Sequence, residues 1–288
     1  MAKQENTKKY SVKDRNRKNR MKKQYRKRQR RKALFRICML ICGVLAGIYY
    51  YVLIHQPENI NTSTLPFKKE DSAVNQINDD VGNISDYPRE LQELLERNPE
   101  AEEFVKGYWK RDDYINKPID LSEDYTPGKV PLLMQWDKRW GYDNYGEDMI
   151  GIAGCGPTCL SMACIYLTGD TEKNPRAMAQ YAYENGYYTS AGTSWSLWTE
   201  GVSCLGLTGE EISLNEKTMK NYLDQGQVII CSMSPGDFTT EGHIILIRGY
   251  GKNGFYVNDP NRKSNSEKQW TFEKLKGQIK CLWALSLK

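Results

Sequence analysis

Residues 37–54 form a run of 18 residues without a single Lys, Arg, Asp or Glu. As a helix, this run is about 27 Å long, close to the roughly 30 Å hydrocarbon core of a bilayer. The neighbouring residues 33–35 lengthen it, so we predict one transmembrane helix over residues 33–55. A core helix of a soluble domain and a cleaved signal peptide are the alternatives. Over 30 residues precede the run and no A-x-A site follows it, which favours an uncleaved helix.

The net charge of +5 averages two unlike parts of the chain. Residues 1–36 contain 17 Lys or Arg and two acidic residues, whereas residues 56–288 contain 24 basic and 34 acidic residues. Because Lys and Arg beside an apolar span stay in the cytoplasm, we predict a single-pass protein of the cell membrane with an extracellular C-terminal part. The basic tail, residues 1–32, is expected to contact anionic lipid headgroups rather than nucleic acid.

Three segments follow the membrane run. Residues 56–84 are polar with few aromatic residues, which is typical of a flexible spacer. Residues 85–128 predict a helical lead-in, with two short helices separated by Asn98 and Pro99. Two such helices bury little surface alone, so docking onto the next unit is favoured over a separate partner-binding module. Residues 129–288 are long enough to bury a core of their own.

The hydrophobic pattern of residues 129–288 changes from helical to strand-like along the chain. Predicted helices cover residues 155–167, 174–185, 194–204 and 216–224, and predicted strands cover residues 130–134, 228–232, 242–250, 255–258 and 281–287. Helices followed by mostly hairpin-linked strands indicate an α+β fold rather than a wound parallel sheet.

The eight cysteines include no C-x-x-C pair and no Cys/His cluster, so we expect neither a metal site nor a cofactor. Cys159 and Cys164 lie among apolar residues of one predicted helix and are expected to be buried. Sequence cannot supply the connectivity of a disulfide, which stays open among Cys164, Cys204, Cys231 and Cys281.

One cysteine has the setting of a nucleophile. Cys155 stands between Gly154 and Gly156, and Pro157 suits the first turn of a helix. A thiol at a helix N-terminus is stabilised as the thiolate, which is the nucleophilic form. A buried cysteine that opens a core helix is the alternative interpretation of this short string.

The only imidazole beyond the membrane run belongs to His243, since His55 ends that run. His243 opens an apolar strand, and the next strand ends at Asp259 after a hairpin signal at 251–254. A three-residue loop places Asp259 opposite Ile245, diagonal to His243 on the same face. An even-numbered loop places the two on opposite faces unless a bulge intervenes. The spacing therefore permits a His–carboxylate pair, while a core histidine and a turn aspartate are the alternatives.

A side-chain amide completes the set. Gln135 precedes Cys155 by twenty residues, and its N–H together with the backbone N–H of Cys155 can form a two-donor oxyanion hole. The resulting chain order is Gln135, Cys155, His243 and Asp259.

Residues 129–288 resemble a papain-like cysteine peptidase domain of the bacteriocin-leader-processing type, the thirty-ninth family of cysteine peptidases. The resemblance rests on four blocks in order: VPLLMQWDKRWG, GCGPTCLSM, GHIILIRGYG and YVNDP. It implies Cys155 as nucleophile, His243 as base, Asp259 as the residue that orients the imidazole, and Gln135 as oxyanion donor. The lead-in also resembles a segment that precedes such domains in Gram-positive surface proteins.

The implied function is that of a membrane-anchored extracellular cysteine peptidase, with a peptide or protein as substrate. Leader-processing members are joined to transporter machinery, and this sequence has no nucleotide-binding motif or six-helix membrane unit. Cleavage of double-glycine leaders is therefore not implied. The alternatives are a cell-wall peptide amidase and a non-catalytic binding module that keeps the fold and uses an aromatic-lined cleft.

Overall fold

The computed structural model describes residues 83–190 and 192–288, which belong to one compact unit. The predicted basic tail, the membrane segment over residues 33–55 and the spacer up to residue 82 lie outside the described residues. Within the described part of the chain, every helix is too short or too polar to cross a bilayer.

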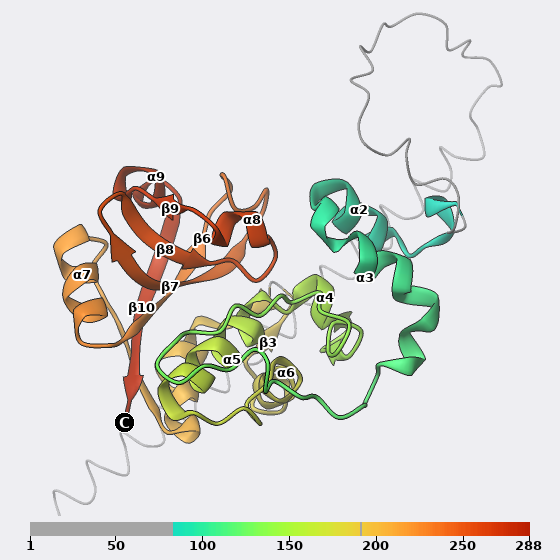
Figure 1. The fold of residues 1–288 in the computed structure, drawn as a ribbon, viewed down its shortest axis with the longest axis horizontal. Coiled ribbons are helices and arrows are strands. Elements are labelled where there is room, and N and C mark those ends of the chain that lie inside the picture. The colour runs from blue at the N-terminus through green and yellow to red at the C-terminus, as the bar shows by residue number, and fades with distance from the viewer. Residues whose placement is uncertain (1–82, 191) are drawn as a thin grey trace, which may run out of the picture. The chain divides into compact units, whose positions relative to one another are not determined.

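Helices dominate the first part of this unit and strands the second (Figure 1). The α-helices are α2 (Arg89–Arg97), α3 (Glu102–Lys106), α4 (Ile150–Ala153), α5 (Cys155–Thr168), α6 (Pro175–Glu184), α7 (Glu216–Asp224), α8 (Lys263–Ser266) and α9 (Phe272–Lys276). Five 3-10 helices are also described: η2 (Ile84–Asp86), η3 (Pro99–Ala101), η4 (Gly107–Asp113), η5 (Trp195–Trp198) and η6 (Gly201–Leu205).

Six strands form one antiparallel sheet in the order β5-β10-β6-β7-β8-β9. These strands are β5 (Leu207–Glu211), β6 (Val228–Met233), β7 (His243–Gly251), β8 (Gly254–Asn258), β9 (Gln269–Trp270) and β10 (Ile279–Leu287). Two small hairpins pair β1 (Asn144–Tyr145) with β2 (Asp148–Met149), and β3 (Tyr188–Thr189) with β4 (Gly192–Thr193). Helices beside an antiparallel sheet confirm the predicted α+β class.

Both faces of the sheet are buried, which explains the continuous apolar run of β6 and β7. Alternate residues such as Ile230 and Leu246 join the core built around α5. Their neighbours Ile229 and Ile245 join a second core, which includes Met219 of α7. The sheet therefore lies between α5 on one face and α7 on the other.

Helix α5 confirms the predicted central helix and is buried along most of its length. Pro157 lies in its first turn, where a missing backbone N–H costs little. Gly169 ends it in the left-handed conformation, with φ of 73°, and donates its N–H to the carbonyl of Ile165. Helix α5 packs against β7, so its first residue, Cys155, lies at the end of a buried helix beside the sheet.

The β7–β8 hairpin has a two-residue turn, Lys252 and Asn253, since Gly251 pairs with Gly254. An even turn alone would separate His243 and Asp259 onto opposite faces. A bulge at Arg248 shifts the register, and Leu246 then pairs with Asn258. The three-residue loop weighed from the sequence is therefore wrong, but the bulge gives the same alignment of the strand ends.

The predicted strand over residues 130–134 is also wrong. This segment belongs to no sheet, because its polar groups have other partners. Asn258 donates its side-chain N–H to the carbonyl of Pro131, and the Leu133 N–H points to the sulfur of Met162. Pro131 itself has no N–H to donate to a ladder.

The 194–204 segment and the first strand of the sheet also differ from expectation. The predicted helix over 194–204 is replaced by the separate 3-10 helices η5 and η6. Strand β5 was missed because it is an edge strand with mostly exposed or half-buried residues, so it lacks the alternation that marks a strand. The remaining predicted helices and strands of this region lie within two residues of the observed bounds.

The lead-in packs onto the rest of the unit, as the sequence predicts. Leu91, Leu94 and Phe104 share a third core with Tyr142, whose hydroxyl donates to the Phe104 carbonyl.

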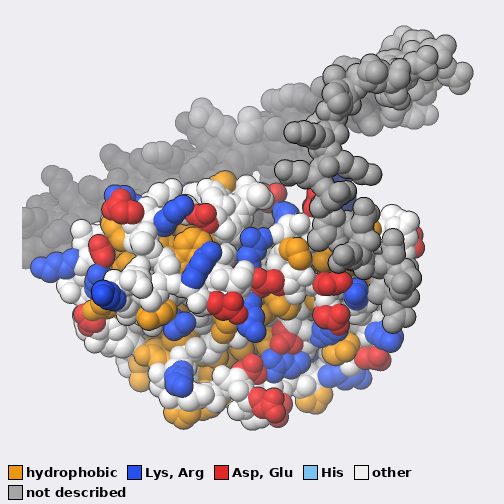
Figure 2. All heavy atoms as spheres, turned by 45° about the horizontal axis from the view of Figure 1, so that its top comes forward, with side chains coloured by type: hydrophobic (Ala, Val, Ile, Leu, Met, Phe, Trp, Pro, Cys, Tyr) orange, Lys and Arg blue, Asp and Glu red, His pale blue; other side chains and the backbone are white. Residues whose placement is uncertain are grey.

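On the face that Figure 2 shows, positive and negative side chains are interspersed between apolar patches.

Candidate active site

Cys155 is the first residue of α5 and its thiol is half-buried. Gly154 precedes it as the N-cap without a side-chain hydrogen bond, so no cap side chain competes for the free N–H groups of the first turn. Gly156 follows it and leaves room for Thr193 of β4, whose side chain would overlap any Cβ at position 156. The β3–β4 hairpin thus packs against the first turn of α5, next to the residue that follows Cys155.

His243 and Asp259 form a buried pair. His243 is the first residue of β7, and Asp259 directly follows the last residue of the neighbouring strand β8. The His243 Nε2–H donates to Asp259 Oδ1 over 2.7 Å, and Asp259 has no exposed surface. This bond fixes the protonated nitrogen of a neutral His243 as Nε2 and leaves Nδ1 without a proton; the His243 side chain also lowers the pKa of the Cys155 thiol. The structure therefore brings together three of the four predicted site residues, Cys155, His243 and Asp259, with His243 interacting with both of the others.

The charges of this group support one another. Burial alone would raise the pKa of the Cys155 thiol, but the hydrogen bond and charge of His243 leave that pKa below its usual value. Burial would lower the pKa of His243, yet the Asp259 carboxylate raises it to about 10. Burial would likewise raise the pKa of Asp259, and the charge of His243 brings it below its usual value. The three groups can therefore form a thiolate–imidazolium pair beside a carboxylate.

Asp259 has further donors that the sequence analysis missed. Asn265 donates its side-chain N–H to Oδ2 over 2.8 Å, and the backbone N–H groups of Asn261 and Arg262 donate to Oδ1. Ser266 accepts the backbone N–H of Asp259. An aspartate before Pro-Asn has the signature of an Asx turn, a signal that predicts the Asn261 contact but not the other donors.

Gln135 lies close by, in a different arrangement from the predicted one. Its backbone N–H donates to the carbonyl of Pro260, next to Asp259. Its side-chain N–H groups donate to the carbonyls of Gly151 and Ile152, at 3.0 and 3.1 Å, and its Oε1 is buried without a partner. The amide is therefore beside the helix turn that leads to Cys155, with both donors in use.

The six cysteines of the described residues are all free thiols, so none of the disulfides left open by the sequence is present there. Cys159 lies one turn beyond Cys155 on α5, and burial raises its thiol pKa well above the usual value. Within residues 83–190 and 192–288, no cluster of three or more His, Cys, Asp or Glu is suited to hold a metal ion.

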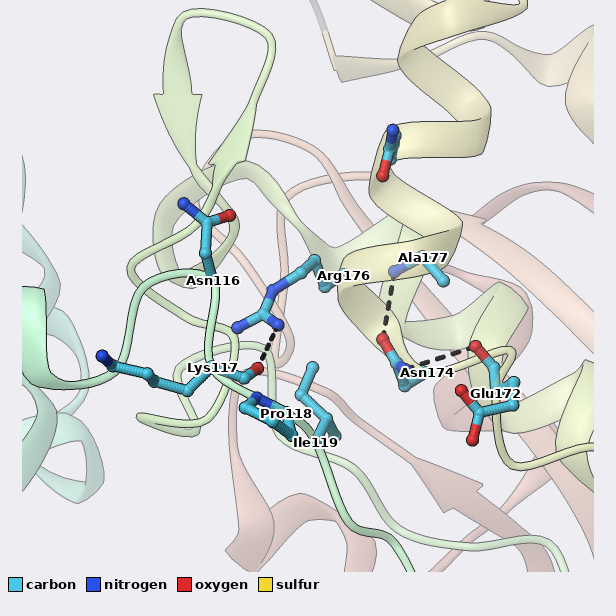
Figure 3. A pocket seen from close by; sticks show the side chains of 9 residues that line it. Asn116, Lys117, Pro118, Ile119, Glu172, Asn174, Arg176 and Ala177 are labelled. Carbon is cyan, nitrogen blue, oxygen red and sulfur yellow. Dashed lines mark hydrogen bonds between the residues drawn. The ribbon is translucent and has the colours of Figure 1, made fainter.

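A pocket of about 500 Å³ opens elsewhere, between residues 116–119 and the start of α6 (Figure 3). Arg176 reaches across it, and its guanidinium pairs with Asp143 and donates to the carbonyls of Lys117 and Arg139. The fold thus uses these donors, and none of the four predicted site residues lines the pocket.

A helix-borne cysteine that faces a buried histidine–aspartate pair on an antiparallel sheet defines a papain-like cysteine peptidase domain. A family model described as the Peptidase_C39-like family matches residues 127–285, more than half of the chain. The chain belongs to this family.

Two solved structures are similar to part of this chain at low sequence identity. The peptidase domain of Streptococcus ComA, a bifunctional ABC transporter involved in a quorum-sensing pathway, is 18% identical, with 47% of this chain and 93% of that chain covered and a TM-score of 0.36. A C39-like peptidase from Bacillus anthracis is 15% identical, with 56% and 96% covered and a TM-score of 0.40. No curated protein matches.

Proposed function

We propose that this protein is a membrane-anchored extracellular cysteine peptidase that hydrolyses peptide or amide bonds through Cys155, His243 and Asp259. The hydrogen bond of 2.7 Å between His243 and the fully buried Asp259, next to a thiol whose pKa is lowered, carries the proposal. A merely structural cysteine would not need a charged imidazole beside it.

The first half-reaction forms a thioester. The Cys155 thiolate attacks the carbonyl carbon of the scissile bond, and the electron pair of the carbonyl moves onto its oxygen. When the tetrahedral intermediate collapses, the carbon–nitrogen bond breaks and the His243 imidazolium gives its proton from Nδ1 to the departing amine. Asp259 holds the ring through Nε2 during this transfer.

The second half-reaction restores the enzyme. His243, now neutral, takes a proton from water at Nδ1, and the resulting hydroxide adds to the thioester carbon. Collapse of this second intermediate breaks the carbon–sulfur bond and releases the acid, which leaves the thiolate–imidazolium pair as before.

Gln135 is the proposed oxyanion donor in both steps. For this role one of its N–H groups must leave the carbonyl of Gly151 or Ile152 for the substrate oxygen. Exchanging one acceptor for another of higher charge is favourable, because a charged acceptor forms the stronger hydrogen bond.

Location limits the substrates. The apolar run over residues 33–55 and the Lys/Arg bias of residues 1–32 support an anchor in the cell membrane, with the peptidase unit outside. Secreted, membrane-proximal or wall-attached peptides and proteins are then the accessible substrates, consistent with a Gram-positive surface protein.

Hydrolysis by the full-length chain tests this function. Purified wild type is incubated with a peptide library and, separately, with cell-wall fragments, and new amino groups are quantified. We expect cleavage that is lost in Cys155→Ala and retained in Cys204→Ala, which removes an exposed thiol of η6. Release confined to cell-wall fragments identifies the amidase instead.

Absence of any cleavage, together with iodoacetamide labelling of Cys155 no faster than after denaturation, rejects the enzyme. The non-catalytic binding module would then account for the fold. It predicts that Cys155→Ala retains a cellular phenotype that deletion of residues 129–288 abolishes.

A further inference from the structure

The segment after Asp259 supplies three of the donors described above, so its position decides the position of the carboxylate. Asn261, Arg262 and Asn265 all donate to Asp259. His243 is the other donor to this group. Any movement of residues 261–265 therefore moves the carboxylate that orients the imidazole.

That segment is held from outside by the lead-in. The Glu100 carboxylate accepts the backbone N–H of Lys263 at Oε2, over 2.6 Å, and that of Ser264 at Oε1, over 3.1 Å. Glu100 thus bonds the first turn of α8, the short helix that carries Asn265. Both bonds join residues more than 160 positions apart.

Asn98 holds the same segment at a second point and also aligns Glu100. Its buried side chain donates to the Asn261 carbonyl, which also accepts the indole N–H of Trp136 over 2.7 Å. Its Oδ1 accepts the backbone N–H of Glu100. The Arg262 guanidinium adds a contact to the Arg97 carbonyl.

We infer that Glu100 is a positioning residue of the peptidase site and acts through Asp259. Asn98 and Glu100 lie outside the matched residues 127–285, so the lead-in adds contacts to a segment that the family domain itself holds through Trp136. The inference rests on the proposed function and adds to it a required role for the lead-in.

The physical consequence is electrostatic as well as geometric. Without Glu100, the N–H groups of Lys263 and Ser264 lose their acceptor and α8 loses its tether to the lead-in, so Asn265 is held less firmly against Asp259. A displaced carboxylate interacts less with His243, which lowers the imidazole pKa and with it the fraction of thiolate at Cys155. Cys159 and Tyr145 are further titratable groups that interact electrostatically with Cys155.

The test measures how iodoacetamide alkylation of Cys155 depends on pH, in the full-length chain, with mass spectrometry of the Cys155 peptide. For Glu100→Ala we expect the midpoint of thiolate formation to rise by about half a pH unit or more. Glu102→Ala is the matched control. It removes the same group two residues along, where the partner is Lys106, and should leave the midpoint unchanged.

A double-mutant cycle separates positioning from a general field effect. In an Asp259→Asn background, Glu100→Ala should add almost nothing, because its route to His243 is already broken. The same shift in both backgrounds, or no shift in wild type, overturns the inference. With a cleaved peptide, we further expect kcat to fall on the order of tenfold or more while KM stays within about twofold.

Folding is monitored by thermal melting at each pH. Should Glu100→Ala be unfolded at the assay temperature, Glu100→Gln, which keeps one acceptor oxygen, must show a smaller shift in the same direction. Failure of the proposed function is distinguishable, because it shows as an ordinary, unlowered midpoint in wild type itself.

Discussion

Cys155, His243 and Asp259 depend on one another at the scale of single residues. The pKa of each of the three groups is shifted by its neighbours in the direction that favours the charged form, although burial opposes all three shifts. A buried charge without its partner is costly, so removing one of the three groups should make the charged forms of the other two less stable.

The pH profile of Cys155 is the first prediction. The thiolate forms as pH rises through the lowered Cys155 pKa, and the imidazolium is lost as pH rises through about 10. We expect hydrolysis only between these limits. Asp259→Asn removes the charge that raises the His243 pKa, which should lower that pKa by roughly one to three units and contract the window from its alkaline side. The kcat/KM profile over pH checks this, and an unchanged alkaline limit would contradict it.

Gln135 is the subject of the second prediction. If its amide stabilises the oxyanion, Gln135→Ala should lower kcat about 10²–10³-fold with little change in KM. Thiolate formation does not involve this donor, so the alkylation rate of Cys155 should stay near that of wild type. A fall in alkylation as large as the fall in kcat would instead mean that Gln135 acts by holding the carbonyls of Gly151 and Ile152 before α5.

At the scale of elements, the β7–β8 hairpin shows what the sequence could and could not predict. The apolar pattern predicted both strands. The number of residues in the turn, odd or even, then limited His243 and Asp259 to the same face or to opposite faces of the hairpin. The choice between them depended on the bulge at Arg248, whose guanidinium donates to the Asn258 side chain and lies over the Tyr256 ring. Such contacts form between strands and leave no local pattern.

The same reasoning separates the two halves of the site. The position of Cys155 can be predicted locally, because the residues that start a helix are consecutive in the sequence. The contacts from Glu100 to α8 join positions more than 160 apart, and nothing in either short segment predicts the other. The strand expected at 130–134 failed for a related reason, since the Asn258 side chain takes the carbonyl that a neighbouring strand would use.

The fit between α5 and β4 gives the third prediction. A Cβ at position 156 would overlap Thr193, so Gly156→Ala must push the β3–β4 hairpin away from Cys155. We expect a loss of stability of about 1–3 kcal/mol, as for other overpacked sites, and reduced hydrolysis. Urea unfolding checks the stability, and Thr193→Gly should relieve most of the added penalty. Gly277→Ala is the control, because that glycine has helical φ and open space around it.

At the scale of the whole molecule, the described residues behave as one unit, although the family domain begins only near residue 127. The lead-in contributes a core of its own and contacts the segment behind Asp259. The proposed spacer, residues 56–84 by sequence, would have a reach of roughly 30 Å as a coil, and its last residue, Ile84, begins η2 in the structure. With the proposed membrane anchor, the peptidase unit would work close to the membrane surface.

The membrane topology is the last prediction. The Lys/Arg bias around the apolar run orients the span, so residues 1–32 should be cytoplasmic and residues 129–288 extracellular. With the protein expressed in a Gram-positive host, protease added to intact protoplasts should degrade the peptidase unit while an epitope on the basic tail stays protected. A matched sample lysed with detergent should lose both. Protection of the peptidase unit in intact protoplasts, or recovery of a soluble form that starts after residue 55, would contradict an uncleaved anchor and restrict the substrates to a different compartment.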